Sequence, residues 1–61
     1  MKVIVLFFKF GSSEKLFLCE NYKIRNNRFH FWDLIGKEFE SICEKYFLFK
    51  REVEVNGSEA L

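Results

Sequence analysis

The stretch Lys2-Val-Ile-Val-Leu-Phe-Phe-Lys-Phe10 decides the fold of this chain. It is rich in β-branched and aromatic residues, a composition that predicts a β-strand. Both of its alternation sets are apolar, with Val3, Val5 and Phe7 on one face and Ile4, Leu6, Phe8 and Phe10 on the other. Because a strand that is apolar on both sides is typically covered on both sides, we expect it at the centre of a sheet.

The next segment predicts a hairpin and a second strand. Gly11-Ser12-Ser13 indicates the hairpin loop, because glycine takes the positive φ that tight loops require. Residues 15–24 predict the second strand. Asn26-Asn27 then interrupts the chain, and either asparagine can cap a following helix through its side-chain oxygen.

From residue 29 to residue 45 the apolar period changes from two to 3.6, which predicts a helix. The predicted apolar stripe consists of Trp32, Ile35, Phe39, Ile42, Cys43 and Tyr46. Gly36 is unfavourable inside a helix, and we attribute it to a close approach to the sheet. Residues 47–55 predict the last strand, Asn56-Gly57 a turn, and residues 58–61 no element of their own.

These elements predict an α+β fold in one domain that spans residues 1–61. The first strand lies at the centre of a three-stranded antiparallel sheet (ββαβ, order 2-1-3), and the single helix packs on one face. The other face still holds large apolar residues, since the chain contains nine Phe, two Tyr and one Trp. An apolar surface of this kind on a small domain usually marks an interaction site.

Catalytic and metal-binding constellations are not expected. His30 is the one histidine, the three glycines are isolated, and the two cysteines lack the spacing of a zinc site. We therefore predict a protein that is not an enzyme, with no catalytic residue, no metal and no cofactor. We also predict reduced cysteines, no membrane segment and a cytoplasmic location, since the apolar run near the N-terminus is too short for a span and lacks a cleavage site.

The predicted function is binding to a protein target, through the sheet face opposite the helix or an outer strand edge. The predicted contact residues are Phe8, Phe10, Phe17, Arg25 and Arg28. A homodimer is included among the expected assemblies. Nucleic acid is disfavoured because the net charge is only +1. A single-stranded nucleic-acid binder nevertheless stays an alternative, because aromatic and basic residues alternate between Tyr22 and Trp32.

The layout resembles the phage antitoxins called discriminator of mRNA degradation (Dmd), which block a host ribonuclease toxin. The resemblance covers nearly the whole chain: Lys2-Val-Ile-Val5 opens an apolar strand, Phe10-Gly-Ser-Ser-Glu14 occupies the expected hairpin, and Glu52-Val-Glu-Val55 lies in the last strand. It implies an inhibitor in the host cytoplasm that occupies the surface of a ribonuclease toxin.

A second resemblance is to the ubiquitin-like (β-grasp) sulfur carriers, such as the small subunit of molybdopterin synthase. It rests on residues 2–8 and on Val53-Glu-Val-Asn-Gly57. The chain ends at Leu61 without the Gly-Gly tail that carries the sulfur in those proteins. This resemblance therefore implies only a related fold without the carrier chemistry.

Overall fold

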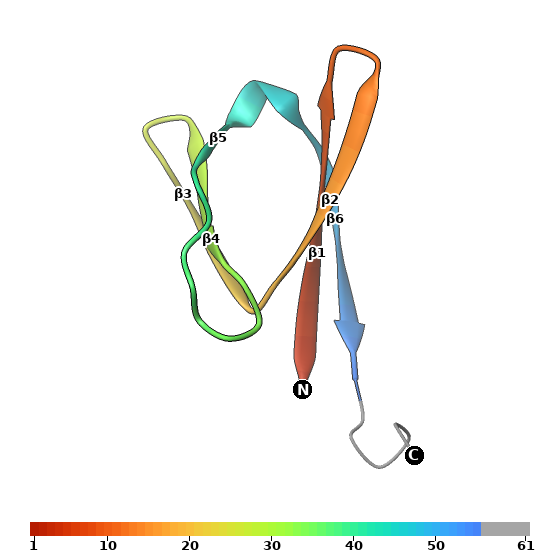
Figure 1. Cartoon of the computed structure of the whole chain (residues 1–61), viewed down its shortest axis with the longest axis vertical. Coiled ribbons are helices and arrows are strands. Elements are labelled where there is room, and N and C mark those ends of the chain that lie inside the picture. The colour runs from red at the N-terminus through yellow and green to blue at the C-terminus, as the bar shows by residue number, and fades with distance from the viewer. Residues whose placement is uncertain (56–61) are drawn as a thin grey trace.

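The structure, a computed structural model, describes residues 1–55 and is built from strands. In chain order its elements are β1 (Lys2–Phe10), β2 (Ser13–Cys19), β3 (Asn21–Arg25), β4 (Arg28–Trp32), β5 (Ile42–Cys43), the 3₁₀ turn η1 (Glu44–Tyr46) and β6 (Phe47–Glu54). They form two antiparallel sheets, sheet A with the order β2-β1-β6 and sheet B with the order β3-β4-β5. Figure 1 shows the two sheets facing each other, linked by the β2–β3 connection at one end and η1 at the other.

The predicted α+β fold is wrong, because residues 29–45 do not form a helix. They form β4, a loop, β5 and η1, and no helix packs on a sheet anywhere in residues 1–55. Asn26 and Asn27 both have positive φ, +52° and +60°, which is the backbone of a tight hairpin turn and not of a helix cap. Phe29 and Phe31 are buried two positions apart, so burial with the period of a strand prevails over the 3.6-residue stripe.

The predicted second strand is divided between the two sheets at Glu20. In β2 the side chains that pack inward are odd-numbered, Phe17 and Cys19, whereas in β3 the inward residue is Tyr22. The change of parity at Glu20 ends one strand and starts another, and the Glu20 amide donates a hydrogen bond to the Trp32 carbonyl at 3.0 Å. The chain therefore passes from sheet A to sheet B within two residues.

In sheet A the first strand lies between its hairpin partner and the last strand, as the sequence predicted. Phe7 is opposite Leu16 of β2 and Phe49 of β6. The β1–β6 register shifts next to Phe7, where Leu48 is the extra residue of a β-bulge. The bulge lets Phe47 pack toward the core while Phe49 stays on the opposite face.

One core lies between the inner faces of the two sheets. Phe8 is its centre: the ring is fully buried and contacts aromatic rings from both sheets at centroid distances of 5.5–6.3 Å. The buried cluster consists of Ile4, Leu6, Phe8, Cys19, Phe29 and Phe31. Phe39, Ile42 and Tyr46, which the helix was expected to present, do pack against this cluster, from the loop, β5 and η1.

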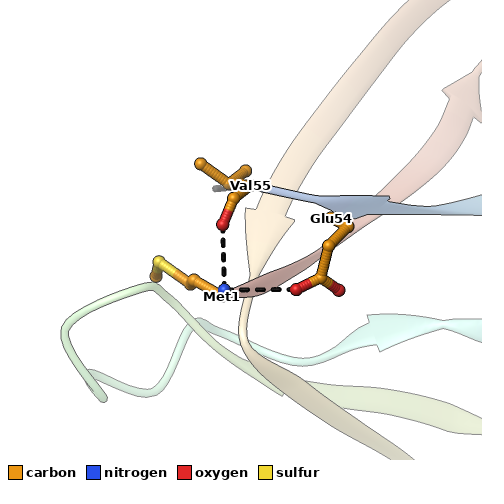
Figure 2. A network of polar contacts seen from close by, with 3 residues as sticks. All are labelled: Met1, Glu54 and Val55. Carbon is orange, nitrogen blue, oxygen red and sulfur yellow. Dashed lines mark hydrogen bonds and ion pairs between the residues drawn. The ribbon is translucent and has the colours of Figure 1, made fainter. Parts of the chain in front are cut away.

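Polar contacts extend the β1–β6 pair beyond the last ladder residues. The N-terminal amine of Met1 donates a hydrogen bond to the Val55 carbonyl at 2.9 Å and forms an ion pair with Glu54 at 3.3 Å (Figure 2). The Val55 amide donates in return to the Met1 carbonyl. These contacts therefore join the start of β1 to the end of β6.

The loop after β4 replaces the middle of the predicted helix. The Asp33 carboxylate accepts hydrogen bonds from the amides of Ile35 (3.0 Å) and Lys37 (2.8 Å). Gly36 has a φ of +86° in this turn, so its role is backbone conformation and not the close sheet contact that we expected. The predicted turn at Asn56-Gly57 and the predictions for residues 58–61 lie outside the described residues.

Candidate protein-binding surface

The outer face of sheet A, which points away from the core, is apolar. Strand alternation and register bring together Val3, Val5, Phe7, Leu16, Leu18, Leu48, Phe49 and Val53, which we call the outer apolar face. The central residues Val3 and Val5 are covered by their neighbours. The flanking side chains are not: Leu16 is 56% exposed, Phe49 48% and Leu18 45%. The solvent-facing side of an antiparallel sheet is commonly polar, so this face departs from the usual pattern.

A hollow lies at the hairpin end of the outer apolar face. Its volume is about 280 Å³, and its floor and walls include Phe7, Leu16, Leu48 and Phe49. The rings of Phe7 and Phe49 are stacked, with centroids 4.3 Å apart. Leu48, the extra residue of the bulge in β6, forms one wall of the hollow. The site can accept an apolar side chain from another molecule.

The Asp33 turn provides a second apolar feature next to the same face. Leu18 shares a hollow of about 310 Å³ with Leu34 and Ile35. The Ile35 side chain is 88% exposed, although the two hydrogen bonds to the Asp33 carboxylate fix the loop that carries it. A hydrogen-bonded loop that presents an aliphatic side chain to solvent can serve as an anchor for a partner.

Charged residues lie at the hairpin end of the outer apolar face and on its edge strand β6, where Arg51 lies between Phe49 and Val53. Lys9 and Glu14 are opposite each other at the hairpin end, and Arg51 lies beside Val5 on β6. An apolar centre with a polar border is the usual anatomy of a protein–protein interface. The border carries two positive charges and one negative charge, which favours a partner with an acidic border.

The five contact residues predicted from the sequence do not form one exposed surface. Phe8 is fully buried, and Phe10 and Phe17 are half-buried on the inner face of sheet A. Phe10 contacts Tyr46 at 5.0 Å between centroids, and Phe17 contacts Phe31 at 5.2 Å. These three phenylalanines therefore close the core.

Arg25 and Arg28 are exposed, but they lie on the other sheet. They are opposite each other beside the β3–β4 turn. Sequence reasoning missed the outer apolar face because it assigned the wrong alternation set of the first strand to the exterior. The even set is apolar from Ile4 to Phe10, whereas the odd set ends at Lys9. That lysine was the available signal that the odd set faces outward.

Three titratable groups of the described residues have shifted pKa values. Burial raises the pKa of the Cys19 thiol above its ordinary value, although a backbone hydrogen bond involving Asn21 offsets part of the rise. Polar contact with Tyr22 raises the pKa of Lys50, and Lys2 lowers the pKa of Glu52. Within residues 1–55 no three His, Cys, Asp or Glu side chains gather as a metal site would require, and both cysteines are free thiols.

Comparisons with protein-family models, curated proteins and solved structures gave no match to this chain. The resemblances to the Dmd antitoxins and to the sulfur carriers therefore stay predictions. No helix among the described residues is long and apolar enough to cross a membrane.

Proposed function

We propose that this protein acts by binding a protein target through the outer apolar face of sheet A. The observation that carries the proposal is the exposure of Leu16, Leu18 and Phe49 on a sheet that already buries its other face in the core. A contiguous apolar surface costs solubility, and monomeric proteins usually keep such surfaces for a partner.

The shape of the surface supports a specific contact. The hollow beside Phe7 accepts one apolar side chain of the target, and Ile35 offers a projecting anchor near Leu18. Interface affinity is usually concentrated in a few such desolvated contacts, each worth about 2 kcal/mol or more. The target that fits is a protein with an apolar ridge and an acidic border, since Lys9 and Arg51 flank the face.

The proposed mode of action is inhibition by surface occupation, without chemistry by the protein itself. A ribonuclease toxin is the first target to test, because the resemblance to the Dmd antitoxins implies it. Direct assay would measure RNA cleavage by a purified toxin of that kind with increasing amounts of the parent protein.

The binding surface can be tested with three matched variants. Leu16→Thr and Phe49→Thr remove exposed apolar groups from the outer apolar face, and Ile24→Thr removes a similarly exposed one (50%) from sheet B. We expect Leu16→Thr to retain the parent melting temperature, and Phe49→Thr to lose only the stability of its stacking on Phe7 and to stay folded at the assay temperature. Both variants should lose a protein that the immobilised parent retains from cell extract. Ile24→Thr should retain that protein.

Two outcomes would contradict the proposal. One is equal retention of the target by all three variants. The other is a stable dimer of the parent in sedimentation that Phe49→Thr converts to a monomer, because the occupant of the face would then be a second copy of the chain.

A further inference from the structure

The outer face of the β3–β4 hairpin is basic. Alternation and register place the side chains of Asn21, Lys23, Arg25, Arg28, His30 and Trp32 on this one face. The inner face of the same hairpin holds the buried Phe29 and Phe31. The six outer residues include three permanent cations, an imidazole and an indole, and none of them is acidic.

The arrangement at the hairpin tip is unfavourable for the isolated protein. Arg25 and Arg28 are directly opposite each other, and like charges at such a pair of positions are destabilising. The ion pairs of residues 1–55 involve Met1 with Glu54 and Lys2 with Glu52, so no carboxylate of these residues lies within ion-pair distance of the two guanidinium groups. This repulsion between two arginines beside the turn would be relieved by an anionic partner.

Arg28 is also held in a fixed position. Its Nε donates to the Ser41 hydroxyl and its terminal nitrogen donates to the Ser41 carbonyl, both at 2.9 Å. A guanidinium has five N–H donors, so three remain for a ligand. Fixing the group in advance lowers the entropy that an anion must offset when it binds.

The far end of the same face has a different chemistry. The Trp32 ring is half-buried, and the Lys23 ammonium lies 5.7 Å from its centroid. Glu38 pairs with Trp32 across the adjacent strand edge. The glutamate repels a phosphate from this end, whereas the indole offers a flat surface on which a base can stack.

We propose that this hairpin face binds single-stranded nucleic acid. Arg25 and Arg28 contact phosphates, Lys23 turns from its place over the Trp32 ring to a third phosphate, and an unpaired base stacks on the ring in its place. Five-residue strands with a rise of about 3.3 Å per residue give a site roughly 17 Å long, enough for a few nucleotides. An acidic peptide would use the cations but not the indole, and a membrane would need apolar side chains that project further than a half-buried Trp32.

This site is separate from the proposed protein-binding surface. The two outer faces belong to different sheets and point away from the common core. The net charge of the chain is only +1, because acidic residues elsewhere in the sequence balance the cations of this face. Binding of nucleic acid can therefore be measured independently of any protein target.

Trp32 is the one tryptophan of the chain, so its fluorescence reports directly on this face. We expect oligouridylate or oligothymidylate to quench it in a saturable manner. With three phosphate contacts, the logarithm of the binding constant should fall with the logarithm of salt concentration with a slope of about −2. Comparing the affinities for the two oligomers shows whether the face prefers RNA or single-stranded DNA.

Two charge-matched variants give the decisive comparison. Arg25→Gln removes a cation from the hairpin face and should weaken binding roughly three- to tenfold while making the salt slope shallower by about 0.7. Arg51→Gln removes the same charge from the border of the outer apolar face and should leave the affinity unchanged. Phe49→Thr should also bind the oligomer normally, which separates this test from that of the proposed function.

Three results would overturn the proposal. The first is no quenching of Trp32 by either oligomer. The second is an equal loss of affinity in Arg25→Gln and Arg51→Gln, which would indicate attraction by net charge alone. The third is equal quenching by polyglutamate or by phosphatidylserine vesicles, which would assign the face to an acidic protein or to a membrane surface.

Discussion

Sheets A and B each bury one face in the same core, but their outer faces have opposite character. The outer face of sheet A presents leucine, valine and phenylalanine to solvent, and that of the β3–β4 hairpin presents lysine, arginine and histidine. Sheet B follows the usual polar pattern of an exposed antiparallel sheet and sheet A does not. Folding accounts for the two inner faces, whereas we attribute the apolar side chains outside sheet A and the facing arginines of the β3–β4 hairpin to binding partners.

The largest expected effect is a difference in unfolding free energy between substitutions on the two faces of β1. Phe8→Ala should cost about 3–5 kcal/mol of unfolding free energy, because the ring fills the centre of the core. Phe7→Ala, on the neighbouring residue, should cost only about 1–2 kcal/mol, since it removes a half-buried ring stacked on Phe49. Urea denaturation of both variants measures the difference. Equal costs would mean that the outer apolar face is part of the folding core.

The second prediction tests the tight turn of the β3–β4 hairpin. Asn27→Val should cost about 1–2 kcal/mol, because a β-branched residue is strained at a φ of +60°. Asn27→Gly should be neutral or stabilising. Asn21→Val makes the same chemical change within β3, where valine is a favoured residue, and serves as the control. If thermal denaturation gave the same stability for the two valine variants, a left-handed turn at Asn27 would be excluded.

The two cysteines compare the core side of sheet A with the outer side of sheet B, where Cys43 is paired with Arg28. Cys19 of sheet A is fully buried and burial raises the pKa of its thiol, whereas Cys43 of sheet B is half-buried. Because the thiolate is the reactive form, Cys43 should react first with a thiol reagent at neutral pH. Cys19 should react at the rate of unfolding. Mass spectrometry over time would show one fast and one slow modification, and two equal rates would contradict the packing around Cys19.

The smallest effect concerns an exposed ion pair on sheet A. The Lys2 ammonium lies 2.6 Å from Glu52 and lowers the pKa of that carboxyl group. A carboxyl with a lowered folded-state pKa adds stability above its unfolded-state pKa, and loses it as pH falls through the folded-state value. Glu52→Gln should therefore be slightly less stable than the parent at neutral pH. The two melting temperatures should converge in acid, and a difference independent of pH would contradict the ion pair.

The sequence correctly predicted the strands that can be recognised from their own residue pattern. The apolarity of residues 2–10 correctly placed β1 at the centre of a sheet, and the last strand was predicted within one residue of β6. The helix was wrong because Phe39, Ile42 and Tyr46 satisfy a 3.6-residue period and a loop around a core equally well. Periodicity gives the spacing of apolar residues but not the partner that covers them.

The candidate surfaces were harder to predict for the same reason. With a helix in place of sheet B, Phe8, Phe10 and Phe17 were assigned to the exterior although they lie on the inner face. Arg25 and Arg28 were expected in a loop that leads into a helix, whereas they lie in β3 and β4. Their cross-strand pairing depends on positive φ at Asn26 and Asn27. An Asn-Asn pair between two alternating segments was the local signal of that hairpin.

The central claim is that the two outer faces are separate binding sites on one core. It is tested most directly by measuring protein retention from nuclease-treated extract and quenching of Trp32 by oligouridylate in two variants side by side. Leu16→Thr/Phe49→Thr should lose the retained protein and keep the quenching. Lys23→Gln/Arg25→Gln should keep the protein and lose most of the quenching. Loss of both activities in either folded variant, or of neither in both, would contradict the claim.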